Sequence, residues 1–358
     1  MARPQHRTEP GRVTVQRCTD PTGWDAFVRD NDGTPFALWG WGDAVETYPH
    51  DRWYLTARAE DDIVGGLPLF HIESRLFGDK LVSLPFTSQG ALLASGPHAE
   101  AATRALLDRA IDLSDDLGVD FASIRATDLG ERERFTHRNR FVTFRVPLDD
   151  GPGRVWERVK SSRQRQIQGA REDDALTFEV GTSLSALRDF YDLYLRSMRG
   201  HGSPPHTFEF FRVLWDRLHD DGHLRLGLVR HEGDVINGVI DLALGERVIQ
   251  KGVVTDFARR DLNGGSLIHW KSLEWAAENG YRSYNLGRTR EASGVYIFKK
   301  SFGGEKVWID DYHYFPDGET QPPDPEDRPY DLARRAWRRL PIPVTRVVGP
   351  KIRRGLSL

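Results

Sequence analysis

The hydrophobic pattern of the first half of the chain indicates a β-hairpin. Residues 52–60 alternate apolar and polar side chains, an Asp61-Asp62 turn follows, and residues 63–71 form a second apolar run. Alternation with a period of two is typical of strands with one buried face. We therefore predict a hairpin, followed by a third extended run over residues 80–85.

A helix and two further strands complete this group. Residues 99–117 carry apolar residues at helical spacing, namely Leu106, Ala110, Leu113 and Leu117. Such a stripe is typical of an amphipathic helix that packs on a core. We expect Gly118 to end the helix and strands to follow over residues 119–125 and 141–146.

The second half repeats this order. Strands are predicted over residues 224–230, 235–244 and 247–255, a turn at Asn263-Gly264-Gly265 leads into a helix to Asn279, and strands over residues 282–286 and 307–314 follow. Two copies of one β-β-β-α-β order imply a duplicated domain. We expect an α/β (α+β) chain of two tandem domains, each a mixed, mostly antiparallel sheet flanked by helices.

The length of 358 residues agrees with two domains and additional segments. We predict a flexible lead over residues 1–12 and domains over residues 13–154 and 155–316. Residues 317–358 are predicted to form a proline-rich linker and a basic amphipathic tail.

Composition excludes several classes of protein. The net charge of −3 argues against a general nucleic-acid binder. Cys18 is the only cysteine, so neither an internal disulfide nor a thiolate metal site can form. The histidines lack the spacing of metal ligands, and we predict no metal. The sequence has no apolar run of about 18 residues and a polar start, so we expect a cytoplasmic protein.

Two segments are strongly basic despite the acidic total. Residues 155–175 are predicted to form a connecting helix whose charges face either water or phosphates. Residues 332–358 carry eight Arg and Lys residues around Trp337, Leu340, Ile342 and Val347. This tail could lie on an anionic membrane surface at the inner face of the membrane, grip RNA, or simply cap the fold.

The turn before the second-half helix is the main candidate for a binding site. Glycines there let a ligand approach the exposed amides that open the helix, and Asn263 or Ser266 could cap it. The alternative is a turn that only precedes an ordinary helix. The predicted donor-binding residues are the helix start and the neighbouring strand edge, namely Lys251, Val253, Asn263, Gly264, Gly265 and Ser266.

Three sequence motifs carry a resemblance to a known family. They are Leu81-Val-Ser-Leu-Pro-Phe86 with Gln89-Gly90, Met198-Arg199 with Gly202-Ser203-Pro204 and Phe210-Phe211, and Gly294-Val-Tyr-Ile-Phe-Lys-Lys-Ser-Phe-Gly303. Over residues 13–316 the chain resembles the Fem-type (FemAB-like) branch of the GNAT acyltransferase superfamily. The resemblance implies two GNAT-like domains and an N-acyltransferase or aminoacyltransferase.

The resemblance also implies the substrates. The donor would be acyl-CoA or aminoacyl-tRNA, used as a co-substrate with no permanently bound cofactor. The acceptor would be a small-molecule or lipid-linked amine, with a cell-envelope precursor expected, and the protein a monomer or homodimer. The coenzyme A turn of GNAT enzymes reads Gln/Arg-x-x-Gly-x-Gly/Ala, and Arg260-Asp-Leu-Asn263-Gly264-Gly265 departs from it at the first glycine.

Acyl transfer to an amine requires a polarised carbonyl and a proton acceptor. By resemblance, Lys299 is the residue that holds a substrate phosphate or carboxylate or stabilises the oxyanion; the alternative is a surface lysine beside Lys300. Arg288 is a guanidinium fork for phosphate or carboxylate, or part of a structural ion pair. Tyr296, expected in a strand, is an acid, an orienting hydroxyl or a packing residue. The acceptor-binding candidates are Arg199, His201, Ser203 and Asn285. The candidates for the base are His201, His206, Asp256 and Asp310.

Two other classes of function stay open at this point. A duplicated acyltransferase fold without turnover could be a non-catalytic binding module for a lipid-linked or protein partner. An RNA-binding accessory protein, built on the two basic segments, is disfavoured by the overall charge.

Overall fold

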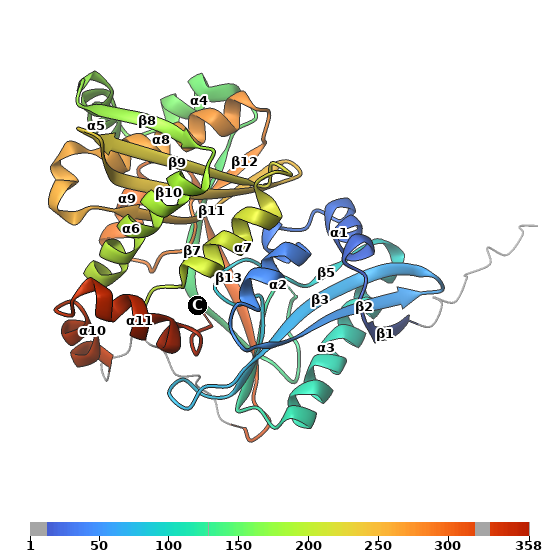
Figure 1. Cartoon of the computed structure of the whole chain (residues 1–358). Coiled ribbons are helices and arrows are strands. Elements are labelled where there is room, and N and C mark those ends of the chain that lie inside the picture. The colour runs from blue at the N-terminus through green and yellow to red at the C-terminus, as the bar shows by residue number, and fades with distance from the viewer. Residues whose placement is uncertain (1–12, 128, 319–329, 358) are drawn as a thin grey trace, which may run out of the picture.

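The computed structural model describes residues 13–127, 129–318 and 330–357 (Figure 1). The predicted lead at residues 1–12 and most of the predicted linker lie outside the described residues. Among the described helices, none combines the length and apolar character that a bilayer-spanning segment needs.

The first half contains the predicted hairpin, crossover helix and following strands. Its elements are β1 (Val13–Arg17), α1 (Pro21–Asp30), η1 (Pro35–Ala37), α2 (Trp39–Val45), β2 (Asp51–Ala59), β3 (Asp62–Ile72), β4 (Lys80–Ser83), β5 (Leu93–Ala94), η2 (Gly96–His98), α3 (Ala99–Leu117), β6 (Phe121–Arg125) and β7 (Thr136–Pro147). Gly118 ends α3 in a left-handed conformation, as its position after the last apolar residue predicted.

The second half repeats the order with its own pair of preceding helices. Its elements are α4 (Gly151–Arg158), α5 (Ser161–Glu172), β8 (Leu176–Gly181), α6 (Leu184–His201), α7 (Phe208–Leu218), β9 (Leu224–His231), β10 (Asp234–Leu244), β11 (Arg247–Thr255), η3 (Phe257–Leu262), α8 (Gly264–Glu278), β12 (Ser283–Asn285), α9 (Gly294–Lys300) and β13 (Glu305–Tyr314). The tail forms α10 (Asp331–Trp337) and α11 (Ile342–Arg353).

Two local predictions were wrong. The basic segment over residues 155–175 is not one helix, because Val159 and Lys160 take extended backbone angles that separate α4 from α5. Tyr296 does not lie in a strand. It lies in α9, whose start is capped by the Ser293 hydroxyl as it accepts a hydrogen bond from the Tyr296 amide.

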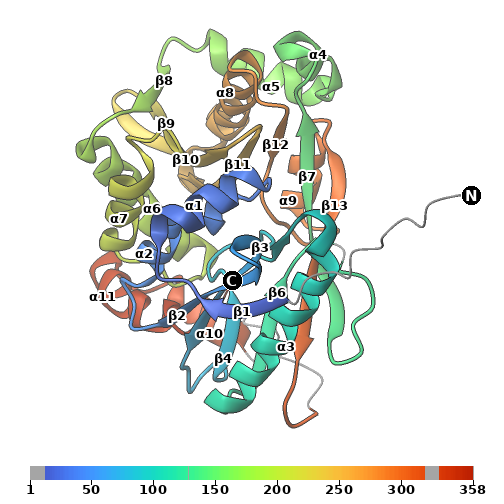
Figure 2. The same ribbon diagram turned by 90° about the vertical axis from the view of Figure 1, so that its right-hand side faces the viewer.

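The two halves share one continuous sheet. The strand order is β1-β2-β3-β4-β6-β13-β7-β12-β11-β10-β9-β8, with β5 paired to β3. The last strand of each half therefore lies beside a strand of the other half: β13 pairs with β6, and β7 pairs with β12. In Figure 2, β7 and β13 run from one half towards the other. The predicted division at residues 154 and 155 stays a prediction, and these exchanged strands couple the halves.

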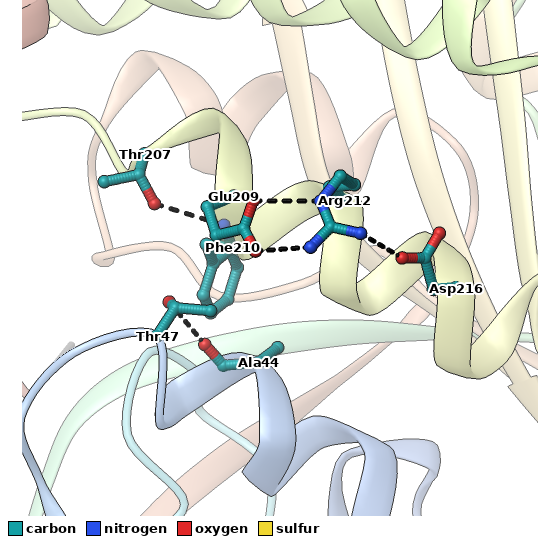
Figure 3. A network of polar contacts seen from close by, with 7 residues as sticks. All are labelled: Ala44, Thr47, Thr207, Glu209, Phe210, Arg212 and Asp216. Atoms are coloured by element: carbon teal, nitrogen blue, oxygen red, sulfur yellow. Dashed lines mark hydrogen bonds and ion pairs between the residues drawn. The ribbon is translucent and has the colours of Figure 1, made fainter.

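Helices also join the halves. Trp41 of α2 and Phe210 of α7 belong to one buried cluster and meet edge to face at 5.7 Å. An ion pair of 2.9 Å between Asp43 and Arg217 links the same two helices. Figure 3 shows α7 beginning where the Thr207 hydroxyl accepts from the Phe210 amide, with Arg212 donating to Glu209 and Asp216 along its exposed side.

The C-terminal tail packs on both halves. Gly349 of α11 lies so close to Pro205, just after α6, that a Cβ atom would be 2.3 Å from the proline Cδ. Beyond α11, the Lys80 Nζ of the first half donates to the Gly355 carbonyl at 2.8 Å, and the Phe86 amide donates to the Ser357 carbonyl at 2.9 Å. The tail is therefore part of the folded body. Whether its outer face also binds a membrane or RNA stays a prediction.

Candidate functional site

A cavity opens in the second half where two parallel strands separate. The strands β11 and β12 pair in parallel as far as Ile249 and Asn285. The pairing ends there, and the residues that follow in both segments, 250–253 and 286–288, line a cavity of about 930 Å³. Its walls come from β11, the start of α8, the turn after β12, α9 and the loop at residues 86–89 of the first half.

The turn after β12 is fixed by hydrogen bonds from several elements. The Asn285 Oδ1 accepts from the Gly287 amide at 2.9 Å and from the Thr143 hydroxyl of β7 at 2.5 Å. Gly287 has a left-handed backbone (φ 71°), and a Cβ there would be 3.1 Å from the Gln250 carbonyl oxygen. A glycine is therefore required where the turn after β12 passes close to β11. Asn285, predicted to bind the acceptor, is instead the residue that holds this turn.

Lys299 reaches the same turn from α9. Its Nζ donates to the carbonyl oxygens of Gly287 at 3.0 Å and of Arg288 at 2.9 Å, and the residue is 9 % exposed. Burial, assisted by the nearby Arg288, lowers the pKa of Lys299 to about 7. Since two N–H groups serve the two carbonyls, a third N–H that can point to a ligand exists only in the ammonium form.

The start of α8 faces the cavity in part. Gly265 and the Ser266 side chain line it, and within the described residues the amides of Gly264 and Gly265 have no hydrogen-bond partner. The predicted cap by Asn263 or Ser266 was wrong. Asn263 takes a left-handed conformation, its side chain makes no cap, and its carbonyl accepts from the Ser266 and Leu267 amides. Gly264 itself is buried against Asn237 and does not line the cavity.

Arg163 is a site residue that the sequence did not single out. From α5 its Nη1 donates to the Ser266 hydroxyl at 2.7 Å and its Nε to the Ser301 hydroxyl at 2.9 Å. Its guanidinium also lies 4.1 Å from the centre of the Phe298 ring. A fixed cation thus stands at the start of α8, where amides and helix dipole already favour an anion. The sequence alone does not tell that Arg163 is half-buried and Arg165 exposed. The break between α4 and α5 at Lys160 decides which face of α5 packs on the rest of the protein.

The cavity is strongly cationic although the protein is acidic. The described residues that line it include no carboxylate and six cations, namely Arg163, Lys251, Arg260, Arg288, Lys299 and Arg353. Lys251 donates to the Phe86 carbonyl at 3.2 Å and lies 5.3 Å from the centre of the Trp41 ring. Burial, with Arg353 and Arg288 nearby, lowers the pKa of Lys251 to about 7. This charge distribution suits a ligand that carries phosphates.

Of the four candidates for the base, the structure brings only His201 to the cavity wall. His206 is buried, with Nδ1 2.9 Å from the Tyr48 hydroxyl and Nε2 accepting from Arg353 at 3.1 Å. Asp256 accepts from the Ala258 amide at the start of η3, and Asp310 is 2.9 Å from His137 on the sheet surface. Burial, followed by Arg260 and Arg338, lowers the pKa of His201, which keeps its imidazole neutral at pH 7.

His269 is a second histidine in the wall. Its Nδ1 lies 2.7 Å from the Gly265 carbonyl, so Nδ1 carries the proton and Nε2 is left as an acceptor. Burial lowers the pKa of His269 to about 3. A group of this kind stays neutral throughout the physiological range and positions Gly265 rather than moving protons.

A second cavity of about 480 Å³ adjoins the first. The two share His201, Arg288 and Arg353 in their walls, and Ser203 lines the second. Nine residues of the predicted site line one or both cavities, namely Lys299, Arg288, Lys251, Val253, Asn263, Gly265, Ser266, His201 and Ser203. The structure does not bring Gly264, Asn285, Arg199 or Tyr296 into either wall; the Tyr296 ring packs edge to face on Phe144 at 5.1 Å.

Comparisons with known proteins agree with this geometry. Residues 157–300 match the model of the family described as "Acetyltransferase (GNAT) domain". No curated protein matches the chain. The fold is similar to that of FemX, with a TM-score of 0.68 and 14% identity over 84% of this chain and 97% of FemX.

Two further solved structures share the whole arrangement. L-PGS from Bacillus licheniformis has a TM-score of 0.55 and 13% identity, over 96% of this chain and 99% of its own. A tandem GNAT protein from the clavulanic acid biosynthesis pathway has a TM-score of 0.52 and 11% identity, over 87% of this chain and 100% of its own. Residues 157–300 therefore match a GNAT acetyltransferase domain, and the chain has the fold of a tandem GNAT protein. The fold that the Fem-type resemblance implied is confirmed.

Proposed function

We propose that this protein is an N-acyltransferase that binds an acyl or aminoacyl donor in the second-half cavity. The acceptor amine would enter from the adjoining cavity between the halves. The observation that carries the proposal is the meeting of three features at one cavity: the unpartnered Gly265 amide of α8, the Arg163 guanidinium and the Lys299 ammonium.

The chemistry assigned to the cavity is a single acyl transfer. The amine nitrogen attacks the donor carbonyl carbon, and the third N–H of Lys299 stabilises the oxyanion that develops. The carbon bond to the leaving thiolate or ribose oxygen then breaks. The proton lost by the amine passes to the neutral His201 imidazole and on to the leaving group, so that protons balance. His201 suits this role because it borders both cavities.

The donor is either acyl-CoA or aminoacyl-tRNA, since both carry phosphates that match the cationic walls. FemX and L-PGS support an aminoacyl donor by fold, and the match to the GNAT family model supports acyl-CoA. We propose a cell-envelope precursor as the acceptor, because the Fem-type resemblance implies transfer onto a lipid-linked amine.

The experiment is transfer of radiolabel from acetyl-coenzyme A or from a mixture of aminoacyl-tRNAs to lipid-linked peptidoglycan precursors. Lys299→Met is expected to lose transfer by about 10²- to 10³-fold, as removal of one oxyanion donor does in other enzymes. Lys300→Met is the matched control, because Lys300 is the exposed neighbour on the same helix. Equal turnover in the two variants, both folded by circular dichroism, would remove Lys299 from the reaction.

A further inference from the structure

The C-terminal tail is strongly basic in an otherwise acidic protein. Residues 330–358 contain eight Arg and Lys residues and one acidic residue, Asp331. Their formal net charge is therefore +7, whereas that of residues 1–329 is −10 and that of the whole chain is −3. A separation of charge of this size gives one part of the surface a positive potential. In Figure 1, α10 and α11 of the tail lie at one edge of the molecule.

Most of the cations of the tail are not used to hold the fold together. Arg334 pairs with Asp331 on α10, and Arg353 donates to the His206 ring. Five others are exposed and have no ion pair among the described residues, namely Arg335, Arg339, Arg346, Lys351 and Arg354. These five charges are therefore available to an anionic partner.

The helix α11 turns its bulkier apolar side chains away from the protein. Thr345 and Gly349 face the body and are buried. Three valines lie on the exposed side with the spacing i, i+3, i+4, which places them in one stripe; they are Val344, Val347 and Val348, at 41 %, 63 % and 40 % exposure. Valine favours a helix less than alanine or leucine does, and an exposed valine gains little from burial. Neither helix formation nor packing within the described residues accounts for this stripe.

We propose that the outer face of α11 docks on an anionic lipid bilayer. Val344, Val347 and Val348 would enter the boundary between headgroups and acyl chains, with the helix lying in the plane of the membrane. Lys351 and Arg354 follow on the same side of the helix and would contact lipid phosphates. The charge of +7 on the tail complements the negative surface of such a membrane.

The exposed side chains favour a bilayer over RNA as the partner. Surfaces that bind single-stranded RNA combine cations with exposed aromatic rings on which bases stack. In the tail, Trp337 is 8 % exposed, and the side chains that stand between the exposed cations of α11 are valines. Apolar side chains flanked by cations are typical of helices that lie on membrane surfaces. The inference does not depend on the proposed acyl transfer.

The test is co-sedimentation of the full-length protein with lipid vesicles at low salt. Vesicles that contain phosphatidylglycerol and phosphatidylcholine are expected to bind the protein, and vesicles of phosphatidylcholine alone are not. Added salt should weaken the binding, because it screens the charges of the tail. The double variant Val347→Ser, Val348→Ser should bind about tenfold more weakly, since it removes apolar surface that enters the bilayer. The double variant Lys351→Gln, Arg354→Gln should bind about 25-fold more weakly, at about fivefold for each cation.

Matched controls come from exposed residues outside the tail. Val180→Ser removes an exposed valine from β8, and Arg104→Gln removes an exposed cation from α3. Each is expected to change vesicle binding less than twofold. All the substituted residues are exposed, so every variant should keep the circular dichroism spectrum of the unmodified protein.

Vesicle binding that both double variants weaken and both controls preserve supports the docking face. Absence of binding to the phosphatidylglycerol vesicles at low salt would overturn it, as would binding that Val347→Ser, Val348→Ser leaves unchanged. Binding of a mixed-sequence RNA oligonucleotide without binding to vesicles would assign the face to RNA and would also overturn it. None of these results bears on the transferase proposal, because that proposal depends on Lys299.

Discussion

The two halves differ at the point where a parallel strand pair ends. In each half the pairing of two parallel strands ends, β4 with β6 in the first half and β11 with β12 in the second. In the second half the residues that follow line a cavity, which Lys299 borders. In the first half the Arg125 side chain occupies the corresponding place, and its Nη1 donates to the carbonyls of Ser83, Leu84 and Thr87 at 3.2, 3.1 and 2.8 Å.

The difference shows how a repeated fold can keep a cavity in one half and fill the corresponding place in the other. Arg125 is 1 % exposed, and its backbone amide also donates to the Ser83 hydroxyl at 2.8 Å. It thereby holds a loop in which Leu84 and Phe86 have left-handed backbones, with φ of 46° and 65°. Such conformations are costly for these residues and persist only where the surroundings fix them. The first half thus stabilises a loop that forms a wall of the second-half cavity.

The largest expected effect follows from removing the Arg125 guanidinium. Arg125→Met would leave three buried carbonyls without their donor and should lower the free energy of unfolding by at least about 3 kcal/mol, at 1 to 3 kcal/mol for each group. Chemical denaturation measures the loss. Arg104→Met, on the exposed side of α3, is the control and should change stability by less than about 0.5 kcal/mol. A stability equal to that of the control would show that Arg125 does not brace the loop.

The next effect concerns donor affinity in the second half. Arg163→Gln removes the cation at the start of α8 and should weaken donor binding by about tenfold to a hundredfold, the range of a charge-assisted contact with phosphate. Titration calorimetry with the donor that supports turnover measures this change. Arg165→Gln, exposed on the same helix, should bind as the unmodified protein does. Unaltered affinity in Arg163→Gln would place the donor phosphates elsewhere.

The pH profile of kcat/KM tests whether the reaction needs a charged Lys299 and a neutral His201. Lys299 must be an ammonium to offer its third N–H, and its pKa is lowered to about 7, so activity should fall as pH rises through about 7. His201 must be neutral, and its pKa is lowered below 6.5, so activity should fall at acid pH below that value. The variant Lys251→Met shows whether the alkaline fall comes from Lys251 or from Lys299. If its profile lacked the alkaline fall, Lys251 rather than Lys299 would be the titrating group.

The smallest effect is expected at Tyr296. Because its ring packs on Phe144 outside both cavity walls, Tyr296→Phe should alter kcat and KM by less than about twofold. Steady-state kinetics of this variant measures it. A tenfold or greater loss of kcat/KM would show that the Tyr296 hydroxyl takes part in the reaction, and would require α9 to move during turnover.

The repeated element order could be predicted from the sequence because it depends on local periodicity. The hairpin over residues 51–72 and the helix α3 are examples, since alternation, turn residues and a terminal glycine each act over a few positions. The exchange of β7 and β13 could not be predicted, because the pattern of a strand does not say which neighbour it pairs with.

Part of the cavity wall could also be predicted. Lys299, expected from a family motif, and Gly265, expected from the rules for helix starts, both line the cavity. Arg163 was missed because its partners Ser266 and Ser301 lie more than 100 residues away. Tyr296 was expected in a strand, although Ser293, three residues before it, is a helix-capping signal.

The most direct measurement is amide hydrogen exchange with and without the saturating donor. If the donor occupies only the second-half cavity, exchange should slow for peptides that cover residues 263–268 and 286–289, where Gly265 and Gly287 border the cavity. Peptides over the Arg125-filled space at residues 83–85 should be unchanged. Protection over residues 83–85 without protection over residues 263–268 would contradict the assignment of the donor site.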